Sequence, residues 1–83
     1  MTDEIRKIVA EHGRLPVDVE TLPADADLFL AGMSSHASVN VMLALEDAFD
    51  VEFPDRMLTR NVFASIATME AALTELRGGE AAA

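Results

Sequence analysis

The sequence contains no cysteine among its 83 residues. This absence excludes disulfides, thiolate metal sites and a cysteine nucleophile, so any thiol chemistry has to be brought in on a cofactor. The chain also has only two histidines, which is a poor ligand set for a transition metal. No glycine-rich phosphate-binding loop occurs, and no G-x-S-x-G motif is present to carry a hydrolase serine.

Long hydrophobic runs are absent as well. No apolar stretch is long enough to cross a membrane. The N-terminal residues MTDEIRKIV lack the basic region, the apolar stretch and the small-residue site of a signal peptide. We therefore expect a cytoplasmic protein without a membrane partner, and we expect it to be a monomer.

Basic residues are few and unevenly placed. Six Lys and Arg stand against 15 Asp and Glu, which gives a net charge of −9. Between Leu15 and Asp55 there are nine acidic residues and no Lys or Arg. Nucleic acid and anionic membranes are poor partners for such a surface. The acidic charge either keeps the protein soluble or steers basic partners toward it.

The residues that are present favour one small, all-α domain over residues 1–83. Half of the chain is hydrophobic, which is enough for a packed core. Thr2 is a candidate cap for a first helix, in which Ile5, Ile8 and Val9 share one face and Gly13 ends the helix. No segment shows the alternating pattern of a strand.

The segment from residue 14 to 34 is long for a connection between helices in so small a domain. Pro16 and Pro23 argue against a continuous helix there. Four apolar side chains could pin the segment to the core, and these are Val17, Leu22, Leu28 and Phe29. Long loops that are pinned in this way often carry function.

A second helix is predicted over residues 35–50. Its core stripe comprises Ser38, Val41, Met42, Leu45 and Phe49. A short helix over residues 56–60 and a last helix capped by Ser65 follow, with the glycines at 78 and 79 ending the last helix and 78–83 forming a flexible tail. In the predicted core Val41, Leu45 and Phe49 pack against Ile5, Ile8, Ile66, Met69 and Leu73.

The start of the second helix is the candidate site. Ser34, Ser35 and His36 lie where backbone N–H groups and the positive end of the helix dipole favour a phosphate. A hydrolase reading of these residues fails, because neighbours on a helix do not face one another. Because the helix start favours a phosphate, we expect Ser35 to carry a phosphate-linked group. Because no catalytic constellation or set of metal ligands is present, we expect the chain to have no catalytic residues and no metal.

Residues 27–55, DLFLAGMSSHASVNVMLALEDAFDVEFPD, resemble the central part of acyl and peptidyl carrier proteins. That family has the pattern D-x-F-x-x-x-G-x-D-S-L, followed by V-x-x-x-x-x-L-E-x-x-F and an I-P-D ending. The positions that match in register are Gly32, Ser35, Val39, Leu45, Glu46, Phe49, Phe53, Pro54 and Asp55. Two positions depart from it: Ser34 replaces an aspartate and His36 replaces a leucine beside the modified serine.

The resemblance implies a four-helix bundle with a long loop between helices 1 and 2. It implies that a phosphopantetheinyl transferase attaches phosphopantetheine from coenzyme A to Ser35, flanked by Gly32, Ser34 and His36. The thiol of that arm then carries acyl groups as thioesters between enzymes. The protein would accordingly be a carrier and a substrate of other enzymes, not an enzyme itself.

The G-x-S-S, S-V and F-A-S-I combination looks most like the stand-alone aminoacyl carrier proteins. That likeness implies loading with an amino acid by an amino acid:[carrier protein] ligase that is similar to a truncated aminoacyl-tRNA synthetase. Two alternatives remain open. The chain could be an acyl carrier protein of fatty-acid, polyketide or nonribosomal peptide synthesis, or it could be a helical interaction module that is never modified.

A partner face is predicted on the second helix. Its residues are Val39, Asn40, Leu43, Glu46 and Asp47, and His36 lies on the same side of the helix. The apolar side chains would contact the partner enzyme, and the acidic side chains would orient it. The competing interpretation is that Val39 and Leu43 pack under the long loop, because a small bundle leaves few apolar positions unused.

Overall fold

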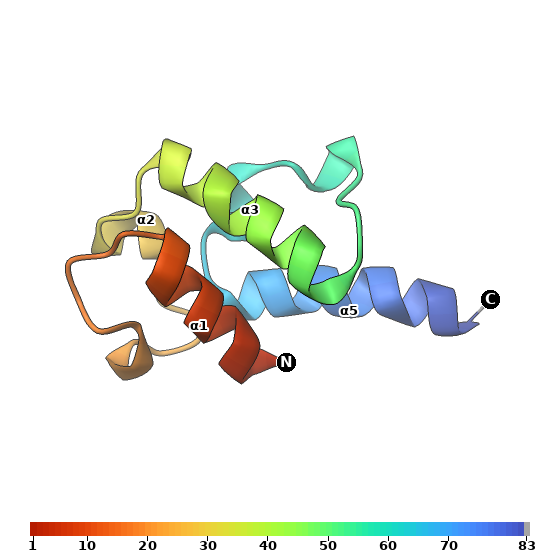
Figure 1. The fold of residues 1–83 in the computed structure, drawn as a ribbon, viewed down its shortest axis with the longest axis horizontal. Helices are drawn as coiled ribbons and strands as arrows, with labels where there is room; N and C mark the ends of the chain where they lie inside the picture. Colours follow the sequence, from red (N-terminus) through yellow and green to blue (C-terminus); the bar gives the residue numbers. More distant parts are fainter. Residues whose placement is uncertain (83) are drawn as a thin grey trace.

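The computed structural model describes the backbone of residues 1–82 and the side chains of residues 1–77. Figure 1 shows the helices in chain order: α1 (Thr2–His12), η1 (Val19–Thr21), α2 (Leu28–Ala31), α3 (Ser35–Phe49), η2 (Asp55–Met57), α4 (Arg60–Phe63) and α5 (Ile66–Ala82). The described residues contain no strand, and the predicted all-α fold is confirmed. None of their helices is long and apolar enough to cross a membrane.

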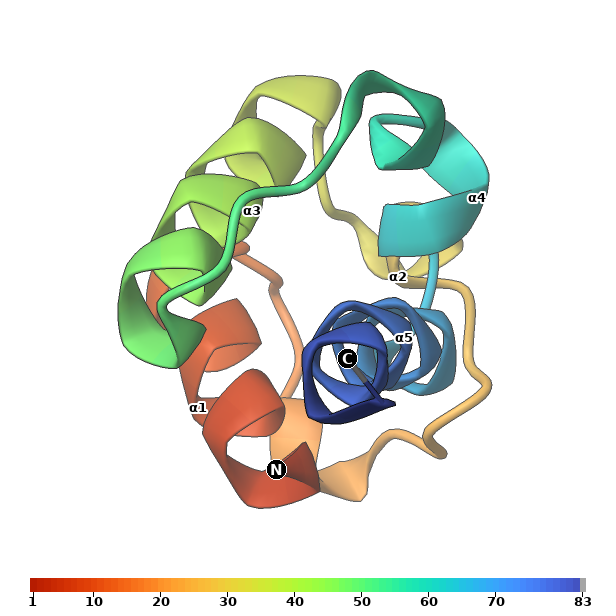
Figure 2. The same ribbon diagram turned by 90° about the vertical axis from the view of Figure 1, so that its right-hand side faces the viewer.

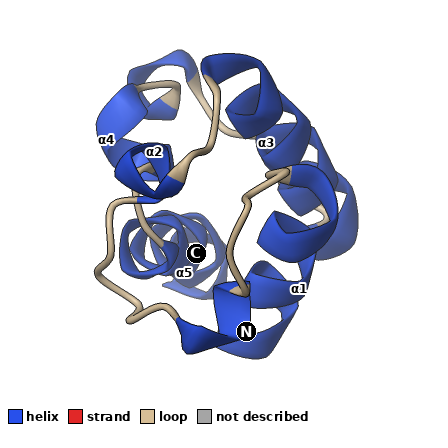
Figure 3. Cartoon of the chain, turned by 90° about the vertical axis from the view of Figure 1, so that its left-hand side faces the viewer, coloured by secondary structure: helices blue, strands red, loops and turns tan. Residues whose placement is uncertain are grey.

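The three long helices and α4 surround a common core. Helix α1 packs against both α3 and α5, and α4 packs against α5. Figure 2 shows this arrangement end-on, with α3 and α4 on one side of the molecule and α1 and α5 on the other. The short α2 and the loop before it close the remaining side, as Figure 3 shows from the opposite end.

The eight residues predicted to pack together in the core are confirmed as buried, but Ser38 and Met42 of the predicted α3 stripe are not. The eight side chains named above are all buried: Ile5, Ile8, Val41, Leu45, Phe49, Ile66, Met69 and Leu73. The α3 stripe is shifted slightly from the prediction. Ala37 is the buried residue of the first turn, whereas Ser38 and Met42 are half-buried at its edge. This shift turns Ser38 toward the surface beside Ser35.

The start of α1 differs from the prediction. Met1 occupies the N-cap position without a side-chain hydrogen bond, and Thr2 is already helical. The Thr2 hydroxyl is used elsewhere, because it donates to the Glu70 carboxylate on α5. Gly13 ends the helix as predicted, with an ordinary φ of −76°, and the positive φ of 54° falls on Arg14 instead.

The long connection is held in place by backbone hydrogen bonds and by apolar side chains, and Leu22 and Phe29 pack against the core as predicted. Arg6 of α1 donates to the carbonyls of Val19 and Leu22, at 2.9 and 2.8 Å. Leu28 is fully buried. Val17 is 45% exposed, so it does not pin the loop to the core, whereas the buried Val19 does. The backbone of the connection also forms a hydrogen bond to the junction of α4 and α5, where the Leu28 N–H donates to the Ala64 carbonyl at 2.7 Å. These bonds tie the connection to α1 and the start of α2 to the junction of α4 and α5.

The prediction of one helix over residues 56–60 is wrong. The chain forms two short turns, η2 and α4, which are separated at Leu58 and Thr59. Both turns bury a side chain, Met57 and Phe63, and the extended backbone at Thr59 lets each of them reach the core. The Thr59 side chain then caps α4 by accepting from the Val62 N–H at 3.4 Å.

Ser65 caps α5 as predicted. Its hydroxyl accepts from the Thr68 N–H, and the Thr68 hydroxyl accepts from the Ser65 N–H, both at 3.1 Å. The predicted helix end at residues 78 and 79 is wrong, because the α5 backbone continues to Ala82. Each helical glycine costs about 1 kcal/mol, and the Glu and Ala that follow favour the helix. The side chains of residues 78–82 and all of Ala83 lie outside the described residues, so the flexible tail stays a prediction.

Candidate functional site

The site begins with the sharp turn between α2 and α3. Asp27 caps α2 by accepting from the N–H groups of Phe29 and Leu30, at 2.9 and 3.2 Å. Gly32 then ends α2 with a φ of +124°, and a Cβ added there would lie 2.7 Å from Cδ of Pro16. Only glycine fits this position. The turn buries Met33 and brings the next two residues to the surface.

Ser34 and Ser35 have different tasks at the start of α3. The Ser34 hydroxyl accepts from the Ala37 N–H at 3.0 Å and is therefore the N-cap. Ser35 is the first helical residue, and its side chain is exposed. The 15-residue helix behind it directs the positive end of its dipole toward this position. A phosphate on Ser35 would lie at a favourable helix end, whereas one on Ser34 would remove the cap.

A groove opens beside Ser35, between α3 and the segment that leads into α4. It has a volume of about 390 Å³, within the usual range of about 300–1,000 Å³ for small-molecule sites. Helix α3 contributes Ser35, Ser38, Val39 and Met42 to one wall. The other wall is largely apolar and aromatic, and includes Phe29, Leu58 and Phe63 together with Thr59 and Arg60.

The aromatic side chains of the groove pack against neighbouring residues. The Phe63 ring packs edge-on against Phe53, with 5.3 Å between centroids and an angle of 74°. The Arg60 guanidinium lies over the Phe29 ring, 4.1 Å from its centroid. The sequence did not reveal this groove, because its walls come from segments that only the folded loop brings together. A covalent group on Ser35 could lie along it without any change of fold.

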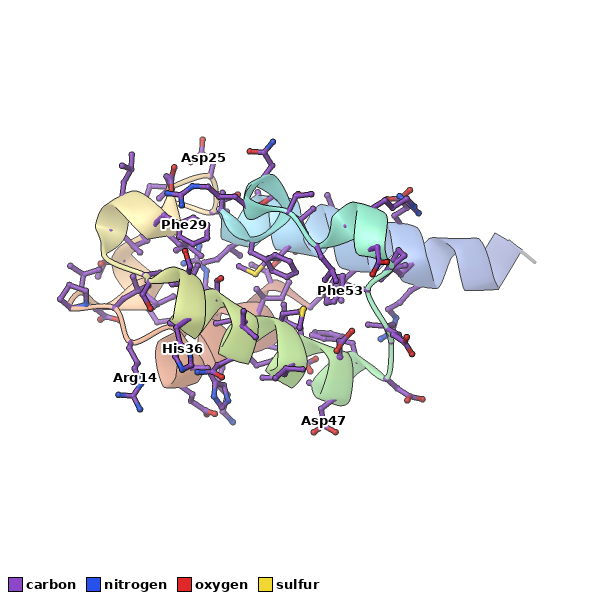
Figure 4. All side chains as sticks on the ribbon, turned by 90° about the horizontal axis from the view of Figure 1, so that it is seen from above. Arg14, Asp25, Phe29, His36, Asp47 and Phe53 are labelled. Carbon is purple, nitrogen blue, oxygen red and sulfur yellow. The ribbon has the colours of Figure 1, made fainter. Side chains whose placement is uncertain are left out.

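His36 is exposed and does not line the groove. Figure 4 shows it projecting from α3 on the opposite side from Phe29. The leucine-to-histidine departure from the family pattern therefore falls on the surface beside the serine, outside the groove.

The predicted partner face is largely at the surface. Val39 and Leu43 are 49% and 53% exposed, so they do not pack under the long loop. Val39 lies at the rim of the groove, whereas Asn40, Leu43 and Asp47 line a second depression that α3 shares with α1. The two apolar side chains thus flank opposite edges of the exposed α3 surface.

Glu46 differs from the other residues of the predicted face. It is half-buried, and its carboxylate accepts from the Phe53 N–H at 2.8 Å. This bond fixes the chain where it leaves α3, next to Asp50, which ends the helix with a φ of 52°. Glu46 therefore has a structural task, and Asp47 is the exposed acid of this helix turn.

Comparison with known proteins agrees with this geometry. The sequence model of a family described as "Phosphopantetheine attachment site" matches residues 3–73. An aminoacyl carrier protein from Agrobacterium fabrum (strain C58 / ATCC 33970) is 48% identical over 83 residues, which cover all of both chains.

Solved structures are also similar to this chain, and two of them illustrate the likeness. One is a crystal structure of an engineered Bradyrhizobium japonicum glycine:[carrier protein] ligase complexed with a carrier protein from Agrobacterium tumefaciens and AMP. The match has a TM-score of 0.87 and 50% identity, and covers 89% of this chain and 99% of that one. The other, a solution structure from Agrobacterium tumefaciens, has a TM-score of 0.75 and 48% identity, with full coverage of both chains.

Proposed function

The chain belongs to the phosphopantetheine-binding carrier-protein family, and from that premise we propose that it holds an aminoacyl group on an arm attached to Ser35. Members of this family are carriers and substrates of other enzymes, not catalysts. The observation that carries the proposal is the placement of Ser35, exposed at the first turn of α3 and beside a groove. When bound, phosphopantetheine supplies the thiol that this cysteine-free chain lacks.

The residues around Ser35 prepare it for attachment. Gly32 makes the turn that brings the serine to the surface, and Ser34 caps the helix so that its first turn stays formed. The helix dipole stabilises the phosphodiester at this position. The exposed hydroxyl is open to a phosphopantetheinyl transferase, which brings its own catalytic groups.

The relatives favour an amino acid as the cargo. The Agrobacterium protein is an aminoacyl carrier protein, and the carrier in the crystal structure is complexed with a glycine:[carrier protein] ligase. We extend this activity to the present chain: a separate ATP-dependent ligase forms a thioester between a small amino acid and the arm. Coenzyme A and ATP are both available in the cytoplasm, where we place the protein.

The cargo can be tested on the phosphopantetheinylated protein. Incubation with a glycine:[carrier protein] ligase, ATP and labelled glycine should attach label that hydroxylamine releases, since hydroxylamine cleaves thioesters. Protein without the arm is the control and should stay unlabelled. Loading by fatty-acyl or malonyl transferases, without any loading by the ligase, would instead assign the chain to fatty-acid or polyketide synthesis.

A second test addresses the α3 surface as the contact with the loading ligase. Leu43→Asp should leave the melting temperature nearly unchanged, because Leu43 is half-exposed, and should weaken loading at subsaturating carrier. Asp47→Lys should slow association, with an effect that shrinks as salt rises, since exposed charges are screened within about 10 Å at 0.1 M ionic strength.

Glu52→Lys is a matched control for Asp47→Lys, because Glu52 is an exposed acid outside α3. Glu46 is unsuitable as a probe of docking, because its substitution also removes the bond to the Phe53 N–H. Wild-type loading rates for both Leu43→Asp and Asp47→Lys at low salt would remove this part of α3 from the interface.

A further inference from the structure

Leu30 of α2 is the most exposed large apolar side chain in the part of the chain that the structure describes. Its exposed fraction is 85%, whereas the other exposed large apolar side chains in that part lie between 43% and 53%. An apolar side chain that stays in water gains nothing from the core. Lysine, glutamine or glutamate would form the helix as well as leucine does. The fold therefore does not account for a leucine at this position.

The backbone that carries Leu30 is closed by hydrogen bonds. At the end of α2 the Gly32 N–H donates to the Phe29 carbonyl at 3.2 Å, and the Met33 N–H donates to the Leu28 carbonyl at 3.0 Å. This pair of bonds is the Schellman motif, which brings the residues at its two ends together. Leu28 and Met33 are both buried, whereas Leu30 is left outside. A side chain on a backbone that is already ordered loses less conformational entropy when a partner binds it.

Leu30 lies close to the hydroxyl that accepts the arm. Ser35 is five residues further along the chain, which places their Cα atoms at most about 18 Å apart even in a fully extended chain, and the turn at Gly32 shortens this span. Figure 1 shows α2 and the start of α3 at the same end of the molecule. A standard protein interface covers about 800 Å² of each partner, which corresponds to a disc of roughly 16 Å radius. An enzyme that acts on the Ser35 oxygen therefore covers α2 as well.

The charges around Leu30 indicate the chemistry of the complementary surface. Asp25 and Asp27 are exposed in the same connection, and no Lys or Arg occurs between residues 15 and 55. On the other side of Ser35, the exposed His36 stands where the family pattern has a leucine. The exposed leucine of this site thus comes from α2, and acids accompany it. The surface that fits is an apolar pocket with basic residues at its rim.

We propose that Leu30 is an apolar anchor by which a phosphopantetheinyl transferase recognises this carrier. This inference rests on the proposed attachment at Ser35. The transferase is the partner that must reach the serine oxygen itself, so its contact surface surrounds Ser35. The loading ligase acts on the thiol at the far end of the arm, so it does not need to cover α2. Leu30 touches no reacting atom, and it determines specificity by binding the carrier.

The test is the steady-state kinetics of arm attachment, with coenzyme A saturating and the unmodified full chain varied. Leu30→Ala should raise the KM for the carrier about 10- to 50-fold, as expected when the burial of three carbon atoms is lost. It should change kcat little, because a contact made equally in the ground state and the transition state is removed. Leu30→Met keeps the apolar side chain and should behave as wild type. Both variants should melt as wild type does, because Leu30 is exposed.

Three controls separate an anchor from a general change of surface. Val17→Ala shortens another exposed apolar side chain of the same connection and should leave the KM unchanged. Added salt should lower kcat/KM of the wild type and of Leu30→Ala by the same factor, since salt screens charges and not an apolar contact. After prolonged incubation with the transferase, verified by intact mass, modified Leu30→Ala should be loaded by the ligase at the wild-type rate.

The outcomes separate this inference from the proposed function. A wild-type protein that gains no arm fails the proposed function, and the inference falls with it. A modified wild type together with an unchanged KM for Leu30→Ala overturns the inference and leaves the carrier function intact. An equal rise in KM for Val17→Ala spreads the contact over the connection and overturns Leu30 as the anchor. Loading of modified Leu30→Ala that is slowed as strongly as its attachment overturns the assignment to the transferase.

Discussion

We expect Ser35→Ala to abolish attachment of phosphopantetheine completely. The alanine variant lacks the oxygen to which the phosphate is bound, and no neighbouring hydroxyl has the same position. Ser34 Oγ is engaged by the Ala37 N–H at 3.0 Å, and Ser38 Oγ donates to the Ser35 carbonyl at 2.6 Å. Intact mass after coexpression with a transferase measures the result, since the arm adds a fixed mass to each modified chain.

Two serine variants serve as matched controls. Ser34→Ala removes the helix cap, which costs about 0.5–2 kcal/mol, but leaves the acceptor hydroxyl in place, so part of the protein should still be modified. Ser38→Ala should be modified like the wild type, because Ser38 lies one turn further along the groove. A mass increase that persists in Ser35→Ala and disappears in one of these controls would move the attachment to that serine.

The sequence predicted best those elements whose signals are local. Val41, Leu45 and Phe49 recur at helical spacing, and all three are buried. The Ser65 cap followed from a hydroxyl that immediately precedes an apolar run, and the reciprocal bonds with Thr68 confirm it. Such patterns depend on helix geometry alone, so they do not need the tertiary fold to be known.

The features that escaped prediction depend on contacts between distant segments. Thr2 does not cap α1, because its hydroxyl meets Glu70 on α5. The helix predicted over residues 56–60 is divided, because Met57 and Phe63 both reach the core. The groove at Ser35 and the stacking of Arg60 on Phe29 have no signal in the sequence, since residues of α2, α3 and the segment leading into α4 meet there only in the folded chain.

We expect Phe49→Ala to destabilise the protein more than any substitution on its surface. Phe49 is the last residue of α3, only 8% exposed, and the Arg77 guanidinium lies 6.0 Å from its ring centroid. Truncating a buried phenylalanine costs about 3–5 kcal/mol, from lost hydrophobic transfer and from the cavity left behind. The free energy of unfolding of a native protein is about 5–15 kcal/mol, so this substitution removes a large part of the stability of so small a domain.

The measurement is chemical denaturation followed by far-UV circular dichroism, because the chain has no tryptophan or tyrosine to report by fluorescence. Val39→Ala is the matched control on the same helix, since half of Val39 is exposed, and its midpoint should shift little. Phe49→Leu keeps most of the apolar volume, so its denaturation midpoint should lie between those of Phe49→Ala and Val39→Ala. An unchanged midpoint for Phe49→Ala would mean that Phe49 contributes little to the core, and that the end of α3 is held instead by the bond from the Phe53 N–H to Glu46.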